Sequence, residues 1–397
     1  MTVFADAGGG RTQVDRLFGT PTILNAAGDT TSTPGRFKFD IDRNVADAGL
    51  RARFDTAAIS HAVTFQGSYY MDEVSRGSVN GTPVLSNIYA PIARPQQLVP
   101  APATVPKLSD TELTGLALAD TMSVFQERLQ LTLGVRQQGV KSNNYNTTTG
   151  AVTSAYDQTA YTPMVGLVVK PLSNVSLYAN YIEGLSKGDV APTTASNQGE
   201  VLAPYLSKQK EAGIKVDFGM LATTISLFEI TKPSGQLGAD NVYRADQEQR
   251  NRGVELTVFG EVQPGIRVLG GVTLIDAVLT KTSTLANLGK TPIGVPEVQA
   301  NLSAEWDTPF APGLTLVANA IYTGHQYLNG ANTQVVPAWT RLDLGARYTT
   351  RINNRPVTLR ALVQNVFDTN YWAGVASYSA LAQGAPRTLL LSMSTDF

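Results

Sequence analysis

The chain has 397 residues with 31 basic and 32 acidic side chains, so its formal net charge of -1 gives no sign of a nucleic-acid partner. It contains no cysteine, which excludes disulfides, cysteine zinc sites and thiol catalysis. Although 43% of its residues are hydrophobic, no apolar run reaches the roughly 18 residues that a membrane-spanning helix needs.

The beginning of the chain carries no recognisable secretion signal. Residues 1–11 lack both the basic start and the apolar core of such a signal. We therefore expect a mature or shortened form of an exported protein. A weak strand pattern follows at residues 11–18.

The first clear pattern lies at residues 46–55, where apolar side chains alternate with charged residues and glycine. This period of two is that of a strand with one apolar and one polar face. The pattern resumes at residues 63–69, which predicts a hairpin with a tight turn. Residues 71–110 are rich in Pro, Ser, Asn and Gly and show no such period, so they are expected to form a long loop.

The remaining strands are predicted in pairs that a short turn joins, and long polar loops separate one pair from the next. The pairs are residues 111–125 with 129–140, 161–170 with 174–183, 209–218 with 221–231, 248–262 with 265–280, 295–306 with 313–324, and 337–350 with 355–368. A final strand covers residues 386–397, where Leu389 and Leu391 fall on one parity and Ser392 and Ser394 on the other.

Short turns at one end and long loops at the other are typical of a bacterial transmembrane β-barrel. The pattern predicts an all-β, antiparallel barrel of about 16 strands with both chain ends on the short-turn side. Parity also assigns the faces: Leu342 and Leu344 face lipid, whereas Arg341, Asp343 and Arg347 face the lumen. A charge on the lipid side costs about 2–4 kcal/mol near the midplane, so the restriction of charges to one parity is the main evidence for this fold.

Several stretches carry a more specific pattern. They are Val175-Ser-Leu-Tyr-Ala-Asn-Tyr-Ile-Glu-Gly-Leu-Ser186, Tyr205-Leu-Ser-Lys-Gln-Lys-Glu-Ala-Gly-Ile-Lys-Val-Asp217, Gln249-Arg-Asn-Arg-Gly-Val-Glu-Leu256, Trp339-Thr-Arg-Leu-Asp-Leu-Gly-Ala-Arg-Tyr348, Val363-Gln-Asn-Val-Phe-Asp-Thr-Asn-Tyr-Trp372 and the terminal Phe397. In order and spacing, these stretches resemble the barrel region of TonB-dependent outer-membrane siderophore receptors, most closely the ferrichrome type.

The resemblance implies a fold and a function. Such receptors are 22-stranded barrels with a plugged lumen, and they move ferric siderophores into the periplasm with energy delivered through TonB. We expect residues 1–397 to be barrel wall with about 16 of those strands and no plug domain. The chain would then be a truncated barrel or one part of a split receptor, and a partner of the TonB complex only if a plug is supplied.

The leading hypothesis is therefore a monomeric receptor in the bacterial outer membrane that contacts lipid and ferric siderophore, with no resident cofactor or metal. The sequence leaves two alternatives open: a passive, porin-like channel of 16 strands, and a soluble all-β binding protein. We do not expect an enzyme, because the chain has two histidines, His61 and His325, and lacks a Gly-x-Ser-x-Gly elbow and a phosphate-binding loop.

Aromatic residues in the predicted loops are the candidate ligand-binding residues. A bulky iron chelate needs aromatic faces and a few hydrogen-bond donors above the pore, and Arg244 adds a donor for an anionic chelate. The candidates are Tyr89, Tyr145, Tyr205, Tyr243, Arg244, Tyr327, Trp372 and Tyr378. Anchoring of the barrel at the lipid headgroups is the alternative role for the loop tyrosines, and the preferred one for Tyr181, Tyr322 and Tyr348.

Overall fold

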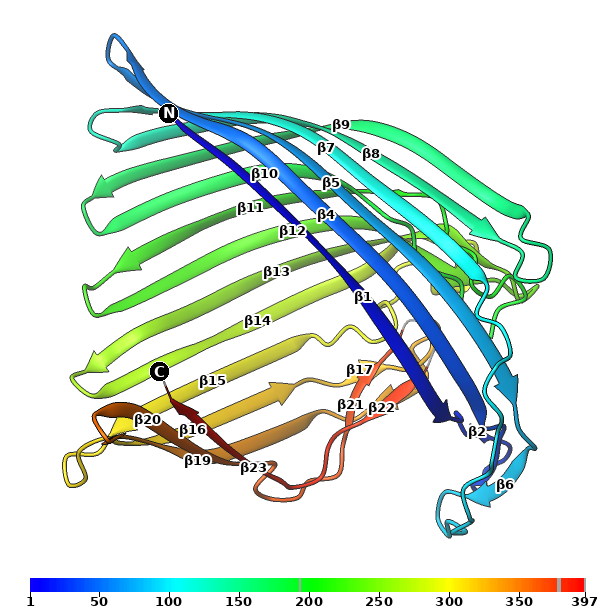
Figure 1. The fold of residues 1–397 in the computed structure, drawn as a ribbon. Coiled ribbons are helices and arrows are strands. Elements are labelled where there is room, and N and C mark those ends of the chain that lie inside the picture. The colour runs from blue at the N-terminus through cyan, green and yellow to red at the C-terminus, as the bar shows by residue number, and fades with distance from the viewer. Residues whose placement is uncertain (193, 377–379, 396–397) are drawn as a thin grey trace.

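A computed structural model describes residues 1–192, 194–376 and 380–395 (Figure 1). Sixteen strands form one antiparallel sheet in which each strand pairs with the next long strand along the chain. They are β1 (Thr2–Phe18), β4 (Gly35–Thr56), β5 (Ile59–Asn80), β7 (Lys107–Val124), β8 (Leu129–Tyr145), β9 (Val152–Leu172), β10 (Val175–Ser186), β11 (Tyr205–Asp217), β12 (Leu221–Leu237), β13 (Tyr243–Gln263), β14 (Ile266–Lys281), β15 (Val298–Asp307), β16 (Leu314–Thr323), β19 (Trp339–Ile352), β20 (Arg355–Gln364) and β23 (Thr388–Thr395). The predicted all-β fold and strand number are confirmed.

Short turns lie at one end of the sheet and longer connections at the other, as predicted (Figure 1). The turn between β19 and β20 places Asn353 at a φ of 50° and Asn354 at 63°. Two successive residues with positive φ make the type of turn whose twist matches that of two paired strands, and asparagine tolerates this conformation well. The Arg351-Ile-Asn-Asn segment therefore closes its hairpin tightly.

The longer connections build small sheets of their own at the opposite end. The first group is a three-stranded sheet of β2 (Thr22–Ile23), β3 (Asp29–Ser32) and β6 (Val84–Asn87). Two hairpins follow, β17 (Gln326–Tyr327) with β18 (Val335–Val336) and β21 (Trp372–Val375) with β22 (Leu381–Gln383); a 3-10 helix, η1, covers Leu285–Asn287. Within the described residues, no helix is long and apolar enough to cross a membrane.

Several strands are much longer than the sequence pattern predicted. The expected loop at residues 71–110 is wrong at both ends, because β5 continues to Asn80 and β7 already begins at Lys107. β1 likewise begins at Thr2, and β4 and β5 have 22 residues each. About 9–11 residues suffice to cross the hydrocarbon. Outside that layer both faces of a strand meet water, so the alternation from which strands are recognised disappears.

The register divides the sheet into two faces. On one face Leu302 pairs with Ala320 and Ala320 with Leu342, and the large aliphatic residues of this parity are exposed, for example Leu227 at 59% and Leu391 at 72%. Arg341, Asp343 and Arg347 share the other parity, as predicted. Tyr322 and Tyr348 lie on the aliphatic face, Tyr322 toward the loop end of the sheet and Tyr348 toward the short-turn end. We call the aliphatic face the lipid face and the opposite one the lumen face.

The sheet order ends with β1 on one side and β23 on the other, and within the described residues no backbone pairing joins these two strands. β1 starts at the short-turn end and β23 finishes there (Figure 1). Neighbouring strands in this sheet are antiparallel throughout, and β1 and β23 also run in opposite directions.

The assignment of the two faces makes a direct prediction. Leu302→Arg places a charge on the lipid face near the middle of β15 and should destabilise the protein by about 2–4 kcal/mol in lipid bilayers. Ser303→Arg, one residue further on the lumen face, is the matched control and should cost much less. Urea unfolding in vesicles measures both, and an equal loss for the two variants would contradict the assignment.

Candidate functional site

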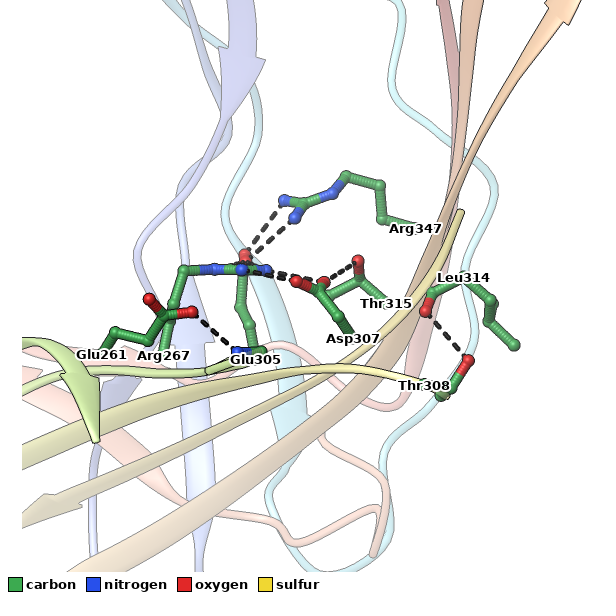
Figure 2. A network of polar contacts seen from close by, with 9 residues as sticks. Glu261, Arg267, Glu305, Asp307, Thr308, Leu314, Thr315 and Arg347 are labelled. Atoms are coloured by element: carbon green, nitrogen blue, oxygen red, sulfur yellow. Dashed lines mark hydrogen bonds and ion pairs between the residues drawn. The ribbon is translucent and has the colours of Figure 1, made fainter. Parts of the chain in front are cut away.

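The lumen face carries several groups of charged side chains that bind one another. At its short-turn end, side chains of β14, β15 and β19 form a network of arginines and carboxylates (Figure 2). Arg267 donates hydrogen bonds to both oxygens of Asp307 at 2.6 and 2.8 Å, and its Nε and Nη2 donate to Glu305 at 3.2 and 3.1 Å. Arg347 donates to both oxygens of Glu305 at 3.0 and 2.9 Å.

This network links three strands next to their turns. Planar guanidinium groups match carboxylates with two parallel hydrogen bonds, which gives geometric precision as well as attraction. Thr315 of β16 donates a further hydrogen bond to Asp307 at 2.7 Å. The network therefore fixes β14 to β19 relative to one another at the short-turn end of the lumen.

At the loop end, the connections pack against one another instead of standing alone. The segment at residues 187–204 contributes Ala191, Ala195 and Leu202 to a buried apolar cluster with Tyr243. Asn197 crosses to the start of β13, where it accepts a hydrogen bond from Tyr243 N at 2.8 Å and donates one to Tyr243 O at 2.9 Å. This part of the loop layer is a small folded core.

A second set of contacts joins the last three long connections. Asn332 Nδ2 donates to Thr291 O at 2.9 Å, and Gly294 N donates to Tyr327 O at 3.1 Å. Gly294, with a φ of 77°, lies so close to Val375 O that a side chain there would collide with it. The loops after β14, β16 and β20 therefore form one unit at the loop end of the lumen.

Two clusters on the lumen face lie at the loop ends of their strands. In one, Trp339 stacks on Tyr371 with ring centroids 4.4 Å apart, and Arg341 reaches Tyr371 Oη at 3.5 Å and Asp343 at 3.0 Å. In the other, Arg16 and Arg76 flank the ring of Phe39, with Phe18 and Phe37 beside them. We call the second group, Arg16, Phe18, Phe37, Phe39 and Arg76, the Arg–Phe cluster.

Two of the predicted ligand-binding tyrosines are buried in the loop layer. Tyr205 and Tyr243 are only 3% and 4% exposed, and Tyr205 Oη lies 3.4 Å from Asp189. Tyr145 donates a hydrogen bond to Asp110 at 2.6 Å and lies beneath Lys107. The structure therefore shows these rings in contacts that support the loops and strand ends.

The other predicted residues are spread over the loop end. Tyr89 is 76% exposed beside the three-stranded loop sheet, whereas Tyr327 and Trp372 belong to the neighbouring hairpins β17–β18 and β21–β22. Arg244 donates two hydrogen bonds to Asp240 at 2.8 and 2.5 Å, which lowers the pKa of that carboxyl to about 2. Tyr378 lies outside the described residues.

Comparison with known proteins identifies the family. Residues 4–366 match the family described as TonB dependent receptor-like, beta-barrel. The chain belongs to the TonB-dependent receptors. It is 38% identical over 407 residues to the ferrichrome receptor FcuA of Yersinia enterocolitica, a match that covers 100% of this chain and 54% of the relative.

A solved receptor structure has the same fold. The crystal structure of BauA, the ferric preacinetobactin receptor of Acinetobacter baumannii, superimposes with a TM-score of 0.83 and 40% identity over 100% of this chain and 60% of its own. The chain spans about half the length of the curated relatives that it matches. Because the family consists of outer-membrane β-barrels, the lipid face defined above is the one that meets the outer membrane.

Sequence reasoning missed both lumen clusters of this TonB-dependent receptor barrel. Trp339 and Arg341 lie inside the predicted strand at residues 337–350, and Arg341 was assigned to the lumen, but their partner Tyr371 lies in a predicted loop. The Arg–Phe cluster falls at the ends of strands that continue past the lipid layer, where the pattern was weak. A signal was present, because Phe37, Phe39 and Ile41 alternate with Arg36, Lys38 and Asp40, the reverse of an apolar lipid-facing parity.

The network at the short-turn end predicts a salt-dependent contribution to stability. Arg267→Met removes the hydrogen bonds to Asp307 and Glu305 and should destabilise the barrel by about 1 kcal/mol at low salt, since these groups are partly exposed and water screens them. The loss should shrink at high salt. Arg351→Met, at an exposed strand end, is the control, and an equal, salt-independent loss in both variants would contradict the role of the network.

The loop core predicts a change in protease sensitivity. Asn197→Ala removes both hydrogen bonds to the Tyr243 backbone and should speed cleavage of residues 187–204 several-fold in intact outer membranes, because opening of a local segment then costs less free energy. Gln198→Ala, whose side chain makes neither of these bonds, should leave the rate unchanged. Equal rates for Asn197→Ala and the unmodified protein would show that the loop is held by other contacts.

Proposed function

We propose that this chain forms the barrel wall of a receptor for ferric siderophores, which its loops capture and its polar lumen passes to the periplasm. The match to TonB-dependent receptors over residues 4–366 is the observation that carries the proposal. Its relatives named above are receptors for ferrichrome and for ferric preacinetobactin. Energy coupling through TonB requires a plug in the lumen, and we propose that residues 1–397 contribute barrel strands and loops and no plug.

The structure supports two different roles for the predicted ligand-binding residues, which are contact with the chelate and support of the loops. We propose that Tyr89, Tyr327 and Trp372 contact the chelate, because they belong to loops at the mouth of the lumen. Tyr89 and Trp372 are exposed there, and Tyr327 is half-buried. Tyr205 and Tyr243 support the loop layer from within. Arg244, already paired with Asp240, orders the tight connection between β12 and β13.

Fluorescence of the purified chain in detergent tests the proposal. Ferric siderophores absorb light and quench nearby tryptophans, so we expect saturable quenching by the iron-loaded chelate. Trp372→Ala should weaken binding about three- to tenfold, the value of one aromatic contact. Trp306→Ala is the matched control, because Trp306 lies on the lipid face.

Two results would count against this function. One is the absence of saturable binding of any iron-loaded chelate by the folded chain. The other is steady ion conductance in planar bilayers without chelate binding, which is the behaviour of a passive channel. A stable barrel that binds the chelate but passes it only when a plug is supplied would agree with the proposal.

A further inference from the structure

The Arg–Phe cluster concentrates positive charge and aromatic surface on the lumen face. The Arg16 guanidinium carbon lies 4.6 Å from the ring centroid of Phe18 and 5.0 Å from that of Phe39. The Arg76 guanidinium carbon lies 5.6 Å from the Phe39 centroid and 5.2 Å from that of Phe37. One phenylalanine ring is thus shared by two cations.

The strand register explains why these residues meet. Arg16 of β1 pairs with Phe37 of β4, and Phe39 of β4 pairs with Arg76 of β5. Cross-strand partners point to the same side of a sheet. This parity of β4 includes Asp47, which pairs with Ser68, and Ser68 accepts a hydrogen bond from Arg136 on the lumen face. The cluster therefore faces the lumen, toward the ends of its strands that lead into the loops.

The charges of the cluster are not balanced. Among the described residues, no carboxylate forms an ion pair with Arg16 or Arg76, and Arg76 Nε is buried without a hydrogen-bond partner. On the opposite face of the same strands, Arg11 pairs with Asp40 and Arg36 with Asp15. Two guanidinium groups around one ring repel each other, and a buried donor without an acceptor is unfavourable. An anion between them would relieve both costs.

The contrast with the other lumen cluster gives the chemistry of that anion. Arg341 forms an ion pair with Asp343, so this surface has no unbalanced charge, and its unpartnered donors Arg341 Nε and Trp339 Nε1 suit uncharged acceptors of a ligand. The Arg–Phe cluster offers flat rings for stacking and guanidinium forks for two adjacent oxygens. A catecholate ring has an aromatic face, two adjacent oxygens and a negative charge. A ferric tris-hydroxamate is electrically neutral and has no aromatic ring.

We propose that Arg16 and Arg76, with Phe39 between them, form a subsite for the anionic aryl groups of a ferric catecholate. This rests on the function proposed above and narrows its ligand class. The guanidinium groups donate hydrogen bonds to the iron-bound phenolate oxygens, and the phenylalanine rings stack on the aryl ring. The subsite lies at the loop end of the lumen, where an entering chelate arrives first.

Equilibrium binding of radioactive iron to the full chain in detergent tests the subsite. The probes are iron loaded on a tripodal tris-catecholate and on a tripodal tris-hydroxamate. Arg16→Gln and Arg76→Gln should each weaken catecholate binding about tenfold or more, the value of hydrogen bonds to a charged group. Hydroxamate binding should change less than about twofold. Catecholate binding to the unmodified chain should also fall more steeply with salt.

Arg11→Gln is the matched control, because it removes the same charge from β1 on the opposite face. It should change neither affinity. Far-ultraviolet circular dichroism shows whether Arg76→Gln folds. If it does not fold, Arg76→Lys, which keeps the charge, replaces it. Arg76→Lys should keep part of the catecholate affinity and the salt dependence of that affinity.

The remaining outcomes decide between this inference and the proposed function. Binding of the hydroxamate with no binding of the catecholate, or equal effects of the arginine variants on both chelates, would overturn the catecholate subsite and leave the receptor function standing. An unchanged catecholate affinity in both arginine variants would do the same. Failure of the folded chain to bind either chelate would overturn both.

Discussion

The structure depends on one constraint, which is that backbone N–H and C=O groups in hydrocarbon have no water to bond with. Each such group must pair within the protein, and a continuous ladder of strands is one of two ways to achieve this. Sixteen strands here pair in chain order without a crossover. The ladder ends at β1 and β23, which run in opposite directions, so they can join directly or through an even number of further strands. In lipid those two edges must be paired.

The same ladder decides where chemistry can occur. Because side chains alternate between faces, each strand sends every second residue toward lipid and the rest toward the lumen. Where strands cross the lipid, arginines and carboxylates therefore gather on the lumen face, as in the network around Arg267 and Glu305 (Figure 2). A receptor lumen needs this arrangement, since a polar chelate must pass through a wall that is apolar outside. In the function proposed above, the loops cover the mouth through which the chelate enters.

The lipid-crossing parts of the fold were predictable from the sequence, and the parts beyond the lipid were not. Lipid requires an apolar side chain at every second position, so residues 46–55 and 337–350 are recognisable on their own. No such requirement acts on the outer half of β5, which was mistaken for a loop. The number of strands survived this error, because extending a strand does not add one.

The candidate binding residues were harder to predict, because they depend on contacts between distant segments. An exposed tyrosine and a buried one look alike in a polar loop, and only the fold shows that Tyr243 packs with Ala191 and Leu202. Arg16 and Arg76 lie 60 residues apart in the chain, and their meeting around Phe39 follows from the register of three strands. Family resemblance, carried by stretches such as Val363 to Trp372, contributed the function that local patterns could not.

Spin-label scanning along β5 tests the account most directly, because the chain has no cysteine of its own and single cysteines can be introduced freely. We predict that labels at residues 65, 67 and 69 are accessible to oxygen dissolved in lipid and that labels at 66, 68 and 70 are accessible to a water-soluble relaxing agent. A bound ferric catecholate should then broaden the spectrum of a label at residue 78, beside Arg76 on the lumen face, and leave one at residue 67 unchanged. Equal accessibility along the strand, or broadening on both parities, would contradict the division into a lipid face and a ligand-binding lumen.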